Sequence, residues 1–121
     1  MLTDQTERRL AEDIIREKAL MRLEQEIPHG IDVEVEKFRM NQQGDLCEIA
    51  ATVYCERESH KKIIIGKNGE ALKVIGTMAR KDIEKLLSTE REIKVYLNLW
   101  VKTRKDWRDD ESSLKRMGYF D

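Results

Sequence analysis

The 121-residue sequence predicts an α+β domain in which helices cover one face of a three-stranded sheet. Apolar residues recur at helical spacing, change to strict alternation, and then repeat both patterns in the order helix–strand–strand–helix–helix–strand. The length suits one compact domain, and no internal repeat or second apolar core is evident. We therefore expect a single domain at 1–121, with a core at about 4–102 and a short helical tail at 103–121.

A long amphipathic helix is expected at 4–27, because apolar residues recur there every four positions. Pro28 cannot continue that helix and should end it. The main stripe consists of Ala11, Ile15, Ala19, Leu23 and Ile27.

Residues 31–55 alternate between apolar and polar side chains, which predicts a hairpin with its turn at 41–45. Cys47 and Cys55 both fall on the second strand, separated by about 26 Å at roughly 3.3 Å per residue. A disulfide cannot span that distance, so both cysteines are expected to be reduced and buried as small hydrophobic residues in the cytosol.

Two helices follow, a short one at 59–66 with Ser59 as its N-cap and a longer one at about 69–87. Gly76 lies inside the longer helix and is expected to mark close packing of that helix. The last strand is expected at 93–102, with Trp100 packed rather than exposed. The apolar residues predicted to face the core from the longer helix are Leu72, Ile75, Ala79, Ile83 and Leu86.

Positive charge is concentrated in one part of the chain. The net charge is −1, from 23 basic and 24 acidic residues. Residues 59–81 carry 6 basic and 1 acidic side chains, a balance of +5, whereas residues 1–58 carry 8 and 14, a balance of −6. A local cationic segment is typical of an anion-binding surface, although a solvated helix face is an equally ordinary explanation.

That segment contains the motif Gly66-Lys67-Asn68-Gly69 at the junction of two predicted helices. Glycines allow a backbone to approach a ligand closely, and the amides at the start of the second helix favour an anion. We therefore expect a loop that binds a phosphodiester of single-stranded RNA. The supporting residues are Lys61, Lys62 and Lys73 as cations, with Ile64 and Ile65 as groove residues that contact bases.

Other sites are not supported by the sequence. A Walker A loop needs a first glycine where Lys61 stands and a Ser or Thr where Asn68 stands. His29 and His60 lack partners at metal-ligand spacing, so no metal or cofactor is expected. The carboxylates at 32–36 and 109–110 are typical of a solvated strand face and a helix cap, so we expect no catalytic site.

The element order and the run Ile63-Ile64-Ile65-Gly66-Lys67 resemble a type II KH domain. More narrowly, the chain resembles the C-terminal KH domain of the Era family of bacterial Ras-like GTPases. The similar segments are 14–18, 26–29, 50–59, 62–67, 75–76, 79–84, 99–102, 106–108 and 118–119.

This resemblance implies a longer protein with an N-terminal GTP-binding domain that acts in maturation of the small ribosomal subunit. It implies that 66–69 clamps single-stranded RNA near the 3′ end of the small-subunit ribosomal RNA. Lys62 stands where the family usually has glycine and Asn68 where it often has glycine; both sit beside the clamp, so nucleotide preference can differ. The connection at 88–91 also looks longer than usual. We expect a monomer in the cytoplasm, with any membrane association peripheral.

Two other functions remain open at this stage. One is a freestanding small KH protein that acts as an RNA chaperone. The other is a protein-interaction or regulatory arm of a GTPase, which would dock a partner through the acidic first helix and the hairpin. The +5 segment favours RNA, because an interaction arm has no need of it.

Overall fold

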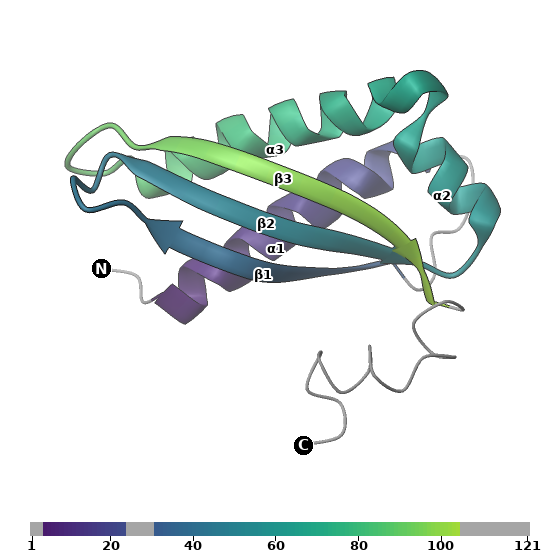
Figure 1. The fold of residues 1–121 in the computed structure, drawn as a ribbon, viewed down its shortest axis with the longest axis horizontal. Helices are drawn as coiled ribbons and strands as arrows, with labels where there is room; N and C mark the ends of the chain where they lie inside the picture. Colours follow the sequence, from purple (N-terminus) through teal and green to yellow (C-terminus); the bar gives the residue numbers. More distant parts are fainter. Residues whose placement is uncertain (1–3, 24–30, 105–121) are drawn as a thin grey trace, which may run out of the picture.

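The computed structural model describes residues 4–23 and 31–104, and within these ranges the predicted order of elements is confirmed (Figure 1). The predicted end of the first helix at 24–27 and the tail beyond residue 104 lie outside the described residues. The elements are α1 (Asp4–Arg22), β1 (Asp32–Met40), β2 (Leu46–Cys55), α2 (Glu58–Ile65), the 3₁₀ turn η1 (Lys67–Gly69), α3 (Glu70–Leu87) and β3 (Lys94–Thr103).

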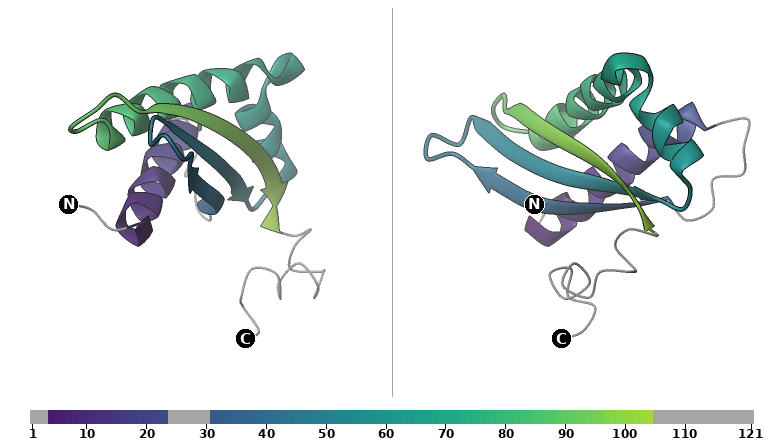
Figure 2. Two further views of the ribbon diagram at one scale, coloured as in Figure 1. Left: turned by 60° about the vertical axis from the view of Figure 1, so that its left-hand side comes forward. Right: turned by 45° about the vertical axis from the view of Figure 1, so that its right-hand side comes forward.

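The three strands form one mixed sheet in the order β1-β2-β3. β1 and β2 are antiparallel, whereas β2 and β3 are parallel and are connected through α2, η1 and α3. All three helices lie on one face of the sheet, and α3 runs beside the free edge of β3 (Figures 1 and 2). This is the α+β arrangement that the sequence predicts.

The core lies between the helices and the inner face of the sheet. Buried side chains follow one stripe on each long helix and alternate positions on β2. Cys47 and Cys55 are both buried, as predicted. The main contributors are Ala11, Ile15 and Ala19 from α1, Ile75, Ala79 and Ile83 from α3, and Cys47, Ile49, Ala51, Val53 and Cys55 from β2.

A β-bulge in β1 interrupts the simple alternation of inward and outward side chains that the sequence predicts. Val35 pairs with Ala51 and Lys37 with Ala50, so the register shifts across Glu36. Because one extra residue reverses the side-chain alternation, Phe38 turns inward and is buried while Lys37 is exposed. Simple alternation from Val35 would have placed Lys37 in the core.

The expectation that Trp100 packs in the interior is wrong. Trp100 and Tyr96 lie on the face of β3 opposite the helices and are 50% and 58% exposed. Alternation explains the difference, because Val95, Leu97, Leu99 and Val101 all face the helices. The residues that alternate with them, Tyr96 and Trp100 included, must point outward.

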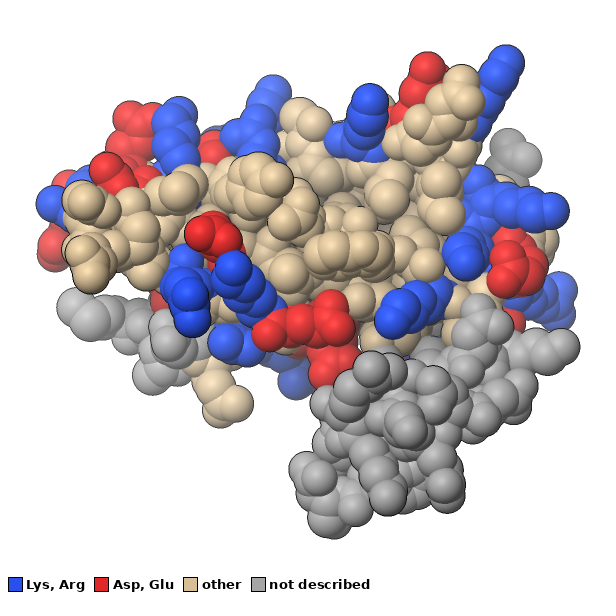
Figure 3. All heavy atoms as spheres, viewed as in Figure 1, with Lys and Arg blue, Asp and Glu red and all other residues tan. Residues whose placement is uncertain are grey.

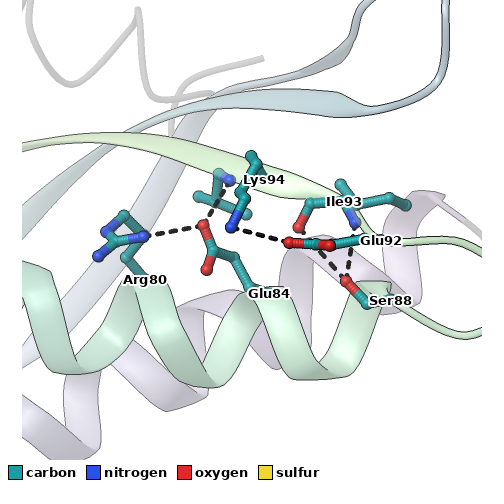
Figure 4. A network of polar contacts seen from close by, with 7 residues as sticks. Arg80, Glu84, Ser88, Glu92, Ile93 and Lys94 are labelled. Atoms are coloured by element: carbon teal, nitrogen blue, oxygen red, sulfur yellow. Dashed lines mark hydrogen bonds and ion pairs between the residues drawn. The ribbon is translucent and has the colours of Figure 1, made fainter.

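A glutamate from a flanking helix caps each edge strand. On β1 the Val35 amide donates to Glu12 Oε2 at 2.9 Å, and on β3 the Val95 amide donates to Glu84 Oε2 at 2.8 Å. Arg80 Nη1 holds the same Glu84 oxygen at 2.9 Å (Figure 4). These contacts bond edge amides that would otherwise lack a partner.

We expect Glu84→Ala to lower the free energy of unfolding by about 1–3 kcal/mol, because it leaves the Val95 amide without its acceptor. Glu84→Gln should cost clearly less, since the amide oxygen can still accept that bond while the ion pair to Arg80 is lost. Urea unfolding of the two variants beside the wild type measures the difference. Equal stability of the two variants would show that the cap contributes only charge.

Candidate nucleic-acid interface

The Gly-x-x-Gly loop connects α2 to α3 and forms the short turn η1. Gly66 adopts φ 74° and ψ 175°, a region that essentially only glycine occupies. Asn68 and Gly69 are both left-handed, with φ 57° and 74°. Asparagine tolerates that conformation better than most residues. Lys67 and Asn68 are exposed at the tip, as expected for residues that meet a ligand.

The two glycines are required for different reasons. A Cβ on Gly66 would lie 2.6 Å from the Cβ and 2.9 Å from the backbone N of Ala71, so this glycine lets the loop close on the first turn of α3. A Cβ on Gly69 would meet nothing within 4 Å. Gly69 therefore faces open space, where a ligand backbone can approach.

Hydrogen bonds within the loop occupy the two amides that directly precede and begin α3. The Gly69 amide donates to Gly66 O at 3.2 Å, and the Glu70 amide donates to Lys67 O. Among the described residues, no side-chain hydrogen bond caps the start of η1, where the Lys67 and Asn68 amides lie. Successive amides beside a lysine are an arrangement that can bind an anion.

α2 begins one residue earlier than predicted, at Glu58, and its N-cap is Arg57 and not Ser59. Lys62 therefore lies in the last turn, where the helix dipole favours a cation. The position of Lys62 relative to the helix dipole is therefore favourable and is not by itself evidence that the lysine binds a ligand. Lys62 is exposed and Lys61 half-buried, so both still add positive charge near the loop. Lys and Arg side chains gather at the end of the molecule where α2 and the loop lie (Figure 3).

The proposed base-contacting role of Ile64 is contradicted by its position. Its side chain is 0% exposed and belongs to the core, because it lies on the face of α2 that packs inward. Ile65 is partly buried against the core, and Ile63 is exposed at 37%. Ile65 therefore keeps some accessible surface, whereas Ile64 has none to offer a base.

A groove of about 520 Å³ begins at Gly69 and runs between α3 and β3. Its helix side is a stripe at positions 69, 72, 73, 76, 77 and 80, which lies beside the core stripe of α3. Gly76 faces β3 and not another helix, since a Cβ there would lie 3.7 Å from Leu99 Cδ1. The strand side consists of Leu97, Asn98 and Leu99.

The free edge of β3 supplies backbone groups to this groove. The Val95 amide points away from β2, because it bonds Glu84 of α3. Outward-pointing amides and carbonyls recur at every second residue of a strand. Those of Leu97 and Leu99 therefore face the groove, beyond the Glu84 cap, where they can donate to or accept from a ligand.

Of the predicted site residues, Gly69 and Lys73 line the groove directly. Gly66, Lys67 and Asn68 directly precede Gly69 in the loop, and Lys61 and Lys62 belong to α2; none of the five is in the groove lining. Sequence reasoning missed Thr77, Arg80 and Asn98. Thr77 and Arg80 could have been found from their helical spacing relative to Gly69. Asn98 could not, because it reaches the site only through the packing of β3 against α3.

A family model for the KH domain matches residues 26–108 of this chain. The chain belongs to the KH domain family. The groove between the Gly-x-x-Gly helix and the free strand edge is thus placed on a KH domain, and the predicted type II order of elements is confirmed.

This KH domain is similar to GTPase Era proteins. It is 52% identical over 119 residues to the Era protein of Alkaliphilus oremlandii and 55% identical over 119 residues to that of Clostridium tetani. In each case the match covers 98% of this chain and 39% of the relative. It is also similar to a crystal structure of Era in complex with MgGDPNP and nucleotides 1506–1542 of 16S ribosomal RNA. The TM-score is 0.74 and the identity 38%, over 98% of this chain and 38% of that one.

A crystal structure of Aquifex aeolicus Era bound to GDP and aluminium fluoride gives the same TM-score of 0.74, also over 98% of this chain. These comparisons confirm the resemblance to the KH domain of Era GTPases. The chain spans somewhat more than a third of the length of these relatives.

We expect Gly66→Ala to destabilise the KH domain more than Gly69→Ala. The positive φ alone costs an alanine about 1–2 kcal/mol in the left-handed conformation of Gly69 and about 1–3 kcal/mol in the glycine-only region that Gly66 occupies. Gly66→Ala also adds overpacking of about 1–3 kcal/mol against Ala71. Chemical denaturation of both variants measures the difference. Equal losses at the two positions would mean that the Gly66–Ala71 contact relaxes without cost.

Proposed function

We propose that this KH domain binds single-stranded RNA as the ribosomal-RNA-binding module of an Era-type GTPase that acts in small-subunit maturation. The observation that carries the proposal is the groove that starts at the Gly-x-x-Gly loop and ends against a free strand edge. The similarity to Era in complex with 16S ribosomal RNA nucleotides supports this assignment. The proposed target is the 3′ end of the small-subunit ribosomal RNA.

The loop and the groove suit different parts of a nucleotide. A phosphate can accept hydrogen bonds from the Lys67 and Asn68 amides and attract Lys67 and Lys73. A base in the groove lies against Leu72 and the open surface at Gly76. Its polar edge then meets the outward backbone groups of Leu97 and Leu99, so contact depends on the base's donors and acceptors. Such a clamp holds about four nucleotides.

The chain itself is proposed to have no enzymatic activity. Its Gly66-Lys67-Asn68 sequence lacks the Ser or Thr that a nucleotide-binding loop presents to magnesium. Within residues 4–23 and 31–104, no three His, Cys, Asp or Glu side chains gather to hold a metal ion. GTP hydrolysis is assigned to an N-terminal domain of the longer protein, by analogy with the relatives.

By the same analogy we propose a monomer in the cytoplasm that contacts the small ribosomal subunit, with any membrane association peripheral. None of the helices in the described part of the chain is long and apolar enough to cross a membrane. The freestanding RNA-chaperone function is less well supported, because the similarity to longer Era proteins covers nearly the whole chain. A purely protein-binding arm would leave the loop and its lysines without a role.

The double substitution Lys67→Asp with Asn68→Asp should abolish RNA binding and leave the fold intact. It changes the loop charge from +1 to −2, and like charges about 4 Å apart cost on the order of 1–4 kcal/mol each at surface dielectrics. Both side chains are exposed, and aspartate tolerates the left-handed conformation of Asn68. RNA titration beside a thermal melt measures both effects.

The matched control is Lys85→Asp with Thr89→Asp, which makes the same charge change at the far end of α3. It should bind RNA nearly as well as the wild type. Equal loss in both double variants would show a general charge effect with no special role for the loop. A melting point lowered by more than about 8 °C would point to damage to the fold.

The affinity for single-stranded RNA should fall as the salt concentration rises. If Lys61, Lys62, Lys67 and Lys73 meet three or four phosphates, the plot of log K against log salt has a slope of about −2 to −3 on single strands. Titrations of one RNA at several potassium chloride concentrations give this slope. A slope near zero would exclude binding through the cationic segment.

A further inference from the structure

Two aromatic side chains lie exposed on β3 directly behind the groove. Tyr96 and Trp100 are 58% and 50% exposed, on the face opposite the helices. Four residues of strand separate them, which is about 13 Å at roughly 3.3 Å per residue. Asn98 lies between them, is exposed, and also lines the groove. The groove and the aromatic face therefore meet at one residue.

The neighbouring strand does not cover these rings. Glu48 of β2 lies beside Tyr96 in the sheet, and Thr52 of β2 lies beside Trp100. Neither side chain is large enough to bury an indole or a phenol ring. An uncharged band crosses the middle of this face in Figure 3, over β3 and the groove beside it. Two large aromatic side chains left open on one strand indicate a binding surface.

Charge on this face favours an anionic polymer along β3. Lys102 follows Trp100 on the same side of the strand and is exposed. Beside Tyr96, the Glu48 carboxylate is neutralised by Lys37 at 2.8 Å, and the Lys37 hydrogen bond lowers the pKa of Glu48. Arg39 adds further positive charge at the same place.

The β1 side of the face repels an anion. Glu34 lies across from Thr52 on that strand, and Glu36 accepts the Thr52 hydroxyl at 2.7 Å. Burial, and then the charges of Glu36 and Glu12, raise the pKa of Glu34, which marks a crowded acidic site. A polyanion on this face is therefore confined to the strip along β3.

We propose that Tyr96 and Trp100 form a second RNA-contact strip, on which a strand leaving the groove over Asn98 stacks its next bases. The proposal rests on the RNA-binding function proposed above and extends it to a longer strand. Base stacking on aromatic rings tolerates sequence, because every base has a π face. The strip thus adds length-dependent affinity, while the groove edge at Leu97 and Leu99 reads the bases that it holds.

Two RNA lengths separate the strip from the groove. The variants are Trp100→Ala, Tyr96→Ala and the ring-preserving Trp100→Phe, each titrated with a 4-nucleotide and a 12-nucleotide single strand. Loss of one stacked base weakens 12-mer binding about 5- to 150-fold in each alanine variant. The 4-mer affinity stays within about twofold of the wild type, and Trp100→Phe recovers most of the 12-mer affinity.

Val74→Ala is the matched control, because Val74 is 48% exposed on α3 and outside the groove lining. It should leave both affinities unchanged, and melting curves should show every variant folded. A wild-type 12-mer that binds no tighter than the 4-mer, or a 12-mer affinity unchanged in Trp100→Ala, overturns the strip and leaves the groove function standing.

Two further outcomes also overturn the proposal. If the wild type does not bind the 4-mer at all, the RNA-binding function fails and the strip fails with it. If the wild type sediments as a dimer and Trp100→Ala as a monomer with unchanged RNA affinity, the aromatic face is an interface between copies of the chain.

Discussion

β2 and β3 run parallel, so the chain must return to the starting end of the sheet between them. A parallel pair needs such a crossover, and here the crossover is α2, the Gly-x-x-Gly loop and α3. That one requirement places the loop where the chain turns and lays α3 along the free edge of β3 (Figure 1). The groove is therefore a product of the topology, and Gly66 closes the turn by letting it approach Ala71.

Local charge matters more in this domain than total charge. The chain as a whole is slightly acidic, yet the crossover segment carries the +5 balance that the loop needs. Acidic residues lie instead on α1 and β1, where they cap an edge amide or border the outer face. Because the two signs of charge lie on different elements, a chain with a net charge of −1 can still present a cationic surface at its crossover segment.

Periodicity in the sequence was enough to predict the order of elements and most of the core, since Ile75, Ala79 and Ile83 repeat at helical spacing. The loop was recognisable because glycines, lysine and helix ends coincide there. The bulge at Glu36 could not be recognised from the sequence, because only the pairing with β2 shows which residue of β1 is extra. The three isoleucines at 63–65 look alike in the sequence, and helix orientation alone decides that Ile64 is buried. The groove lining on β3 and the exposure of Trp100 both depend on packing between distant segments.

The two glutamate caps affect whether copies of this chain can associate through their sheet edges. An uncapped edge strand is a template for another strand, and sheets that join at such edges are a common route to aggregation. The helix carboxylates of Glu12 and Glu84 each accept a hydrogen bond from one edge amide, Glu12 at the β1 edge of the sheet and Glu84 at the β3 edge. A second chain that tried to extend the sheet would have to displace a charged group on either side. The caps thus guard against sheet-to-sheet polymerisation while the open length of β3 beyond Glu84 stays available.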